Sequence, residues 1–208
     1  MRAAPSCGAA LAVVHCGMVR LDKIYTRGGD QGETSLGDGS RVAKSSLRIA
    51  ALGEVDEANA AIGIARLHVG VAEDELLARV QNDLFDIGAD LCVPIEEGEA
   101  PSLRVTQAQV DWLEARIDQL NAELPPLTSF VLPGGTPGSA YLHFARTVVR
   151  RAERVVVHLL EAPDERVNRL VLVYLNRLSD LLFVQARVAA GTGAGDTPWQ
   201  PAKHRDGG

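Results

Sequence analysis

Four arginines and one glutamate gather within nine residues of a stretch that reads as a helix. Arg146, Arg150, Glu153 and Arg154 follow at steps of four, three and one residues, which places them along one side of that helix, and Arg151 lies beside them. Neighbouring guanidinium groups repel one another, so the cluster costs stability unless anions compensate it. A triphosphate would do so through bidentate contacts. The alternative is a solvated basic face with internal ion pairs, in which Glu153 holds an arginine in place.

A glycine-rich segment near the N-terminus is the second candidate for binding phosphate. Residues 24–44 hold five glycines, several hydroxyl residues and the cations Arg27, Arg41 and Lys44. Glycines let backbone N–H groups approach an anion closely, and cations neutralise its charge. The segment lacks the Gly-Lys-Ser/Thr ending of a Walker loop and the strand–Gly-x-Gly-x-x-Gly–helix context of a dinucleotide site. The alternative is a flexible entry to the first helix.

A polar stripe interrupts an otherwise apolar helix near the C-terminus, at Asn176, Asp180, Phe183 and Arg187. Polar groups are costly when they are buried without partners, so the stripe should meet either the arginine cluster or a ligand. Two carboxylates of the first helix are further candidates to pair with the arginines, Asp56 and Glu57. The alternative is that Asp56 and Asp180 are structural ion-pair partners.

Several catalytic patterns are absent from the sequence. It contains no Glu-x-x-His, which di-iron helix bundles use, and its five histidines show no metal-ligand spacing. It has no Gly-x-Ser-x-Gly elbow and no evident Cys–His arrangement. Any chemistry would therefore rest on positioning and electrostatics, with the nucleophile brought by a substrate or cofactor.

The elements that must position these side chains are helices. Apolar residues recur at three- and four-residue steps over 45–69, 73–92, 139–161 and 164–190, and between Thr106 and Pro125. Thr106 and Ser139 are the expected N-caps of the third and fourth helices. Residues 94–101 are predicted to be a loop, and 127–138 an ordered connection or a mobile loop. The pattern predicts an all-α, five-helix bundle with ferritin-like up-and-down packing.

Composition and charge exclude several classes of protein. The 208 residues are 46% hydrophobic and 23% charged, as expected for one soluble domain. The net charge of −6 gives no global basic footprint for nucleic acid, and no run of 18 apolar residues could form a membrane span. Three scattered cysteines are too few for a disulfide scaffold or a four-ligand zinc site. A reducing, cytoplasmic compartment fits best.

The expected helical domain covers residues 18–190. Residues 1–17 carry one arginine and an apolar piece shorter than a signal-peptide core, so we interpret them as a disordered extension or a misassigned start, with export as the alternative. Met18 is followed at once by sequence that reads as the start of a domain. Residues 191–208 are rich in glycine and proline and are predicted to be a flexible tail.

Three segments carry a resemblance to a known family. The first is Tyr-Thr-Arg-Gly-Gly-Asp-Gln-Gly-Glu-Thr-Ser (25–35) with Arg-Val-Ala-Lys (41–44), and the second is Ala-Leu-Gly-Glu-Val-Asp-Glu-Ala-Asn (51–59). The third joins Phe-Val-Leu-Pro-Gly-Gly (130–135), Ala-Arg-Thr-Val-Val-Arg-Arg-Ala-Glu-Arg (145–154) and Leu-Asn-Arg-Leu-Ser-Asp-Leu-Leu-Phe (175–183). In order and spacing they resemble the ATP:cob(I)alamin adenosyltransferases of the trimeric, PduO-like type, over residues 22–190. One departure is at Gly29, where Gly-Gly-Asp stands for the family's common Thr-Gly-Asp and a hydroxyl is missing.

The resemblance implies a homotrimer with active sites between subunits. It implies that ATP phosphates are wrapped by one subunit through Thr26, Arg27, Gly28, Gly29, Thr34, Ser35 and Lys44. It implies ATP contacts from the neighbouring subunit through Arg150, Arg151, Glu153, Arg154 and Asn176.

For the corrinoid, the resemblance implies a site that includes Phe130, Asp56, Arg146, Asp180 and Phe183. Asp56 and Arg146 match a pair that bridges subunits and helps to order the corrin site. Phe130 matches an aromatic residue at the lower face of the corrin, which helps to displace the lower axial base and leaves four-coordinate cob(II)alamin. The catalytic roles thus fall to Asp56, Arg146, Arg150 and Phe130.

The implied reaction is attack of Co(I) of cobalamin on C5′ of ATP, which forms adenosylcobalamin and releases triphosphate with the help of Mg²⁺. This fits the absence of a protein nucleophile, because Co(I) is itself a strong one. Implied partners are a flavoprotein or other reductase that supplies Co(I), and an adenosylcobalamin-dependent mutase or dehydratase. Two alternatives stay open: a non-catalytic nucleotide- or cobalamin-binding carrier bundle, and a purely structural bundle with a polar interface.

Overall fold

The computed structural model describes residues 24–25, 27–95 and 103–205, and five α-helices dominate them. Their bounds are α1 Leu47–Arg66, α2 Val71–Cys92, α3 Gln107–Asn121, α4 Pro137–Glu161 and α5 Arg169–Ala189. The prediction of five helices is therefore confirmed. None of these helices combines the length and apolar character needed to cross a membrane.

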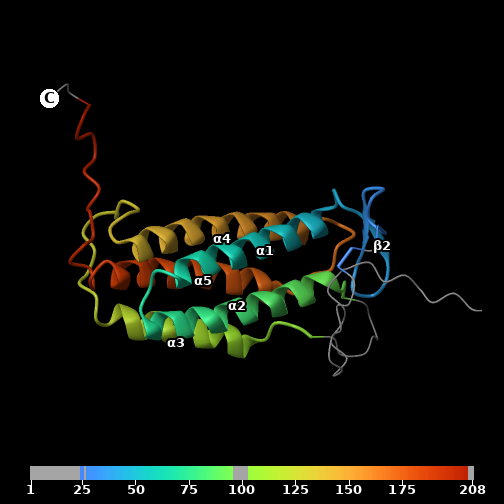
Figure 1. The fold of residues 1–208 in the computed structure, drawn as a ribbon, viewed down its shortest axis with the longest axis horizontal. Helices are drawn as coiled ribbons and strands as arrows, with labels where there is room; N and C mark the ends of the chain where they lie inside the picture. The colour runs from blue at the N-terminus through green and yellow to red at the C-terminus, as the bar shows by residue number, and fades with distance from the viewer. Residues whose placement is uncertain (1–23, 26, 96–102, 206–208) are drawn as a thin grey trace, which may run out of the picture.

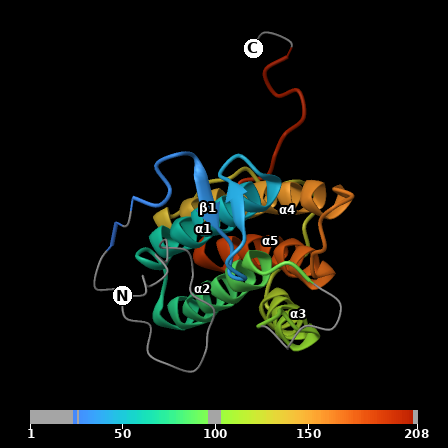
Figure 2. The same ribbon diagram turned by 90° about the vertical axis from the view of Figure 1, so that its right-hand side faces the viewer.

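The helices form a bundle in which α5 lies at the centre. Figure 1 and the end-on view of Figure 2 show α1 and α4 on one side of α5, and α2 and α3 on the other. Helix α5 packs against α4 and α3, while α1 packs against α4 and α2. Gly138 at the start of α4 lies so close to the α1–α2 link that an added Cβ would sit 2.4 Å from the carbonyl oxygen of His68. The helices α1 and α4 therefore run antiparallel.

The core follows the three- and four-residue spacing of the sequence. Ala51, Val55, Ala58 and Ile62 form the buried stripe of α1, each at most 2% exposed. Small residues also recur on α4, where Ala145 and Ala152 are fully buried, and they let the two helices approach closely. Burial of each large aliphatic side chain contributes roughly 1.5–3 kcal/mol, so this stripe rather than helix propensity holds α1 in place.

The structure corrects two of the predicted helix starts. Ser139 is not the cap of α4: the cap is Thr136, whose Oγ1 accepts a hydrogen bond of 3.2 Å from the backbone N–H of Ser139, and Pro137 takes the first helical position. Helix α5 begins at Arg169 instead of 164 because Asn168 caps it, with its Oδ1 accepting from the backbone N–H of Leu170 at 3.0 Å. The predicted cap Thr106 is confirmed for α3.

The glycine-rich segment forms a short antiparallel hairpin that the sequence analysis did not predict. Strands β1 (Glu33–Ser35) and β2 (Arg41–Ala43) pair with Thr34 opposite Val42. Asp38 Oδ1 accepts hydrogen bonds from the backbone N–H and the hydroxyl of Ser40, at 2.8 and 2.7 Å, which fixes the turn. The backbone N–H of Gly37 donates to the carbonyl oxygen of Cys92 at 2.9 Å. The hairpin is thereby tied to the end of α2.

The connection between α3 and α4 is ordered and pairs with the segment that follows α5. Val131 and Pro198 form an antiparallel bridge, and the backbone N–H of Leu132 donates to the carbonyl oxygen of Thr197 at 2.9 Å. The part of the predicted flexible tail between residues 196 and 199 thus makes specific contacts. The predicted extension 1–17 and residues 206–208 lie outside the described residues.

The two loop regions lie at opposite ends of the bundle. Figure 1 shows the β1–β2 hairpin at one end, and the α3–α4 connection with the C-terminal segment at the other. Helix α1 spans most of the distance between them with its 20 residues. At 1.5 Å per residue, that is about 30 Å.

Candidate functional site

A pocket of about 450 Å³ lies at the hairpin end of the bundle, between α1 and α2. One side of it is polar, and the hairpin region contributes Thr34, Ser35 and Lys44. Asp56 adds a carboxylate from α1. The remaining wall comes from α1 and α2 and is mostly apolar: Ile49, Leu52, Gly53, Val55, Asn59, Leu84, Phe85, Gly88 and Cys92. The pocket can hold a ligand with one anionic and one apolar part.

Lys44 lies over the glycine loop that precedes the hairpin. Its backbone N–H donates to the carbonyl oxygen of Gly32 at 2.8 Å. A Cβ added at Gly29 would lie 2.9 Å from Lys44 Nζ and 3.2 Å from the carbonyl oxygen of Glu33. A side chain at position 29 would therefore have to displace the ammonium group.

Two arginines frame the same loop. Arg41 donates from Nη2 to the carbonyl oxygen of Gly28 at 2.8 Å and so braces the loop against β2. Arg27 is exposed and has a φ of 63°, a left-handed conformation that few residues other than glycine adopt. Its guanidinium lies 5.8 Å from the ring centroid of Tyr25. The remaining predicted loop residue, Thr26, lies outside the described residues.

Arg151 on α4 is held by carboxylates of α1 within the same chain. Its Nε donates to Glu54 Oε2 at 2.5 Å, and its Nη2 donates to Glu57. These two hydrogen bonds raise the pKa of Arg151 above its usual range. The expectation that Glu57 pairs with the cluster is thus confirmed, while Asp56 makes no ion pair with it inside the described part of this chain.

The other cations of the cluster lack such partners. Arg150 and Arg154 are exposed, and the guanidinium of Arg154 donates to the backbone oxygen of Arg150 at 3.1 Å. The Nε of Arg146 is buried and has no hydrogen-bond partner among the residues that the structure describes. Burial and the nearby charge of Arg150 lower the pKa of Arg146. Within the described residues, this face of α4 therefore carries positive charge that no carboxylate compensates, and Glu153 beside it forms no ion pair with it.

The polar stripe of α5 does not meet the arginines of α4 within the described residues. Asn176 and Asp180 are exposed, and Asp180 lies 3.9 Å from Arg177 on its own helix. Phe183 is half-buried and contacts the ring of His143 edge-on, with 6.0 Å between centroids. Burial, with the charge of Arg146 nearby, lowers the pKa of His143, so this imidazole is neutral at pH 7.

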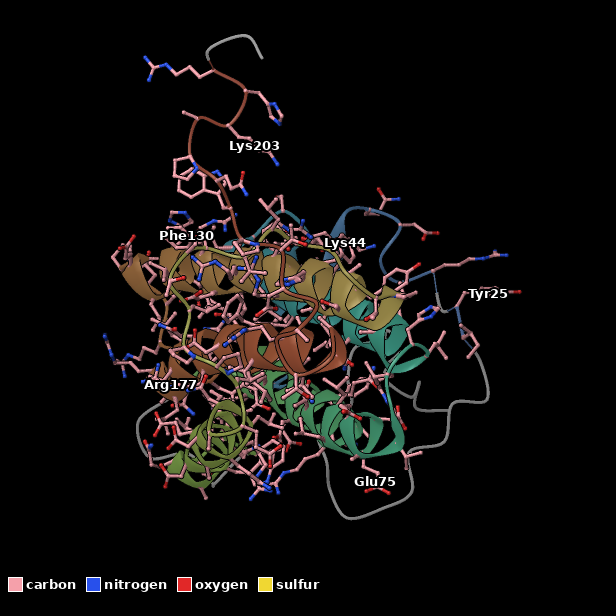
Figure 3. All side chains as sticks on the ribbon, turned by 90° about the vertical axis from the view of Figure 1, so that its left-hand side faces the viewer. Tyr25, Lys44, Glu75, Phe130, Arg177 and Lys203 are labelled. Atoms are coloured by element: carbon pink, nitrogen blue, oxygen red, sulfur yellow. The ribbon has the colours of Figure 1, made fainter. Side chains whose placement is uncertain are left out.

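Phe130 stands at the far end of the bundle from Lys44. The two side chains are labelled in Figure 3, which looks along the bundle from the end that carries Phe130. Phe130 is 78% exposed, and its ring lies 6.1 Å from that of Trp199, centroid to centroid. An exposed aromatic side chain on an ordered loop is suited to contact a flat apolar ligand.

Several pocket residues were missed by the sequence analysis, above all Asn59, Phe85 and Cys92. Phe85 had a detectable signal, because it is a large aromatic side chain at an outward position of α2, where it is 58% exposed. No group of three or more potential metal-ligating side chains occurs among the described residues.

Comparisons with known proteins identify the family of the chain. Residues 24–189 match the cobalamin adenosyltransferase family. A corrinoid adenosyltransferase of Mycobacterium tuberculosis is 53% identical over 190 residues, which cover 90% of this chain and 97% of the relative. A phenylalanine-to-histidine variant of the PduO-type ATP:corrinoid adenosyltransferase of Lactobacillus reuteri, solved with cobalamin and ATP, superimposes with a TM-score of 0.80 at 38% identity over 86% of this chain and 97% of that one. An arginine-to-lysine variant of the same enzyme, solved with ATP, gives a TM-score of 0.77 at 37% identity over 85% of this chain and 100% of that one. The chain belongs to the cobalamin adenosyltransferase family.

Proposed function

We infer that this protein transfers the 5′-deoxyadenosyl group of ATP to the cobalt of cobalamin and releases triphosphate. Family membership supports this activity, and so does the likeness to an enzyme solved with both substrates. The observation that carries the residue assignment is the uncompensated positive charge of Arg146, Arg150 and Arg154 on α4. A polyphosphate supplies the charge that this face lacks.

The reaction needs no nucleophile from the protein. The Co(I) electron pair forms the new Co–C5′ bond, and the C5′–O bond breaks with its electrons going to triphosphate. The protein must hold C5′ in line with the cobalt and stabilise the negative charge that develops on the leaving group. We assign the second role to Lys44, Arg150 and Arg154, with Thr34 and Ser35 donating hydrogen bonds. Arg151 braces the cluster against α1 through Glu54 and Glu57.

We propose that Mg²⁺ accompanies the triphosphate instead of occupying a protein cage. The described residues offer no cluster of metal ligands, and Mg²⁺ in nucleotide sites is commonly held by substrate phosphates and water. Thr34 and Ser35 are among the residues that line the pocket where such an ion would be held. When bound, it neutralises charge on the phosphate oxygens.

We propose that the complete site forms between subunits of a homotrimer. Lys44 and the loop of Phe130 lie at opposite ends of one bundle, about 30 Å apart by the length of α1. This separation favours a site to which one chain contributes Lys44 and another contributes Phe130. Asp56 is exposed, and Arg146 has a buried, unpartnered Nε, so these two are suited to pair across the interface. We also propose that the helices of each subunit pack up and down as in ferritin-like bundles.

We propose that Phe130 and Phe183 form the apolar wall of the corrinoid site. An apolar contact under the corrin excludes water and the lower axial base, which favours the reduction of Co(II) to Co(I). A separate reductase would supply the electron, and an adenosylcobalamin-dependent mutase or dehydratase would take the product, both in the cytoplasm. Asp180 and Asn176 are exposed on α5 and available to polar groups of the substrates.

The test is formation of alkylcobalamin, which is visible as a change in the absorption spectrum. Purified protein is mixed with ATP, Mg²⁺ and chemically reduced cobalamin, with and without each component, and triphosphate is measured in parallel. We expect equal amounts of adenosylcobalamin and triphosphate. Binding of both substrates without turnover would instead identify a non-catalytic carrier. Absence of any ATP-dependent thermal stabilisation would refute the nucleotide site itself.

A further inference from the structure

The segment after α5 returns to the connection that carries Phe130 and pairs with it. The backbone N–H of Trp199 donates to the carbonyl oxygen of Phe130 at 2.7 Å, and the hydroxyl of Ser129 donates to the carbonyl oxygen of Trp199 at 2.7 Å. The return is tight, because a Cβ added at Gly195 would lie 2.2 Å from the carbonyl oxygen of Ala190. The backbone on both sides of Phe130 is thus held by residues of the C-terminal segment.

One buried ion pair holds this arrangement to the bundle. Arg187 of α5 donates from Nε to Asp196 Oδ2 at 2.8 Å, and the two side chains are only 4% and 10% exposed. The same guanidinium donates from Nη2 to the carbonyl oxygen of Pro125 at 2.8 Å. Arg187 therefore grips the C-terminal segment and the start of the α3–α4 connection together.

The other end of the connection is also fastened to α5. Thr136 Oγ1 donates to the carbonyl oxygen of Ala189 at 2.9 Å. Between these anchors at Pro125 and Thr136, Phe130 is exposed and its main ring contact is Trp199. The position of the Phe130 ring therefore depends on where the C-terminal segment lies.

We propose that Arg187 and Asp196 are positioning residues for the corrinoid site: their ion pair sets the C-terminal segment, which places Phe130. Trp199 transmits this placement through the backbone pairing and the ring contact. The proposal rests on the proposed function, because it assumes that Phe130 acts on the corrinoid. Removal of one partner of a buried pair leaves an uncompensated charge, so the C-terminal segment should detach from α5 when Asp196 loses its charge.

The test compares two carboxylate-to-amide variants. Asp196→Asn breaks the buried pair with Arg187. Glu114→Gln breaks an exposed pair of the same helix α5, in which Arg177 Nε lies 2.7 Å from Glu114 Oε1. Each is assayed with cob(II)alamin plus a reductant and, separately, with pre-reduced cob(I)alamin. We expect Asp196→Asn to slow the Co(II) route about tenfold or more and the Co(I) route much less, since small misplacements of active-site groups cost up to about 10²-fold. Glu114→Gln should change neither.

A second readout follows the segment without any turnover. The chain has two tryptophans, so Trp112→Phe leaves Trp199 as the single tryptophan, which is excited selectively at wavelengths where tyrosine does not absorb. We expect Asp196→Asn in this background to increase quenching of Trp199 by iodide or acrylamide, while far-UV circular dichroism stays unchanged. Trp199→Ala, which leaves the ion pair intact, should reproduce the selective loss of the Co(II) route.

Two results would overturn the proposal. The first is an equal loss of the Co(I) and Co(II) routes in a folded Asp196→Asn protein, which would mean a general structural role. The second is unchanged Trp199 quenching, which would mean that the pair does not hold the segment. If even the unmodified protein forms no adenosylcobalamin, the proposed function fails. The quenching experiment still decides whether the ion pair between Arg187 and Asp196 holds the C-terminal segment.

Discussion

Arg150 and Arg151 are adjacent in the sequence but differ in what they touch, so their removal should have different effects. Arg150 makes no side-chain hydrogen bond or ion pair within the part of the chain that the structure describes, whereas Arg151 is bound to Glu54 and Glu57. We expect Arg150→Ala to reduce kcat/KM for ATP strongly. Arg151→Ala should act mainly on stability.

The expected sizes follow from these contacts. A hydrogen bond to a charged group contributes about 1.5–3 kcal/mol, so loss of a bidentate contact with triphosphate costs roughly 3–6 kcal/mol, or about 10²–10⁴-fold in rate. Exposed ion pairs contribute about 0–1 kcal/mol each, and the Arg151 side chain is 40% exposed. Its loss should lower the free energy of unfolding by at most about 2 kcal/mol. Arg150→Ala should not destabilise the fold, because it relieves repulsion with Arg146.

The assay measures initial rates with chemically reduced cobalamin over a range of ATP concentrations, together with thermal unfolding of both variants without ligand. Far-UV circular dichroism and gel filtration confirm that each variant is folded and assembled. A larger loss of kcat/KM in Arg151→Ala than in Arg150→Ala would refute the assignment. So would a clear loss of thermal stability in Arg150→Ala without ATP.

Three further predictions follow from the structure. Phe130→Ala should slow the reaction from cob(II)alamin by about tenfold or more while leaving that of pre-reduced cob(I)alamin nearly unchanged, and equal rates for both would remove its proposed role. Lys44→Ala should raise the KM for ATP about tenfold through loss of a charge-assisted contact, measurable by isothermal titration as weaker ATP binding. Burial and the charge of Asp83 raise the pKa of Asp86, so its protonated form favours the fold and that stabilisation is lost as pH rises through the folded-state pKa. Asp86→Asn should therefore raise the Tm by a few degrees at pH 7, and the gain should vanish in acid, where Asp86 is itself protonated; a gain independent of pH would contradict this.

The helical fold could be predicted from the sequence because its signal is local. Apolar residues at three- and four-residue steps marked all five helices, and Thr106 was a correct cap. The errors lie at helix starts where two capping residues compete: Thr136 rather than Ser139 caps α4, and Asn168 delays α5. The hairpin was missed because strands of three residues in a glycine-rich segment carry no measurable alternation.

The candidate site could be predicted only in part, since proximity depends on packing. Thr34, Ser35 and Lys44, which belong to one glycine-rich motif, line one pocket, and Asp56, which the resemblance assigns to the corrinoid site, lines the same pocket. Phe85 could be recognised as an exposed aromatic side chain of α2, but its place in the pocket depends on how α1 packs against α2. Nor could periodicity tell which arginine of the cluster would turn toward the carboxylates of α1.

The separation of the hairpin from the Phe130 loop has a consequence for mixed particles. If each centre draws Lys44 from one copy and Phe130 from the next, a subunit defective in one and a subunit defective in the other can repair each other. Co-refolding the Lys44→Ala and Phe130→Ala chains in randomly assembled rings should give about one centre in four that holds both intact residues, so the mixture should convert cob(II)alamin at low ATP faster than either chain alone. A chain carrying both substitutions, mixed with intact protein, should instead be dominant-negative, because each such subunit impairs the two centres that it shares with its neighbours.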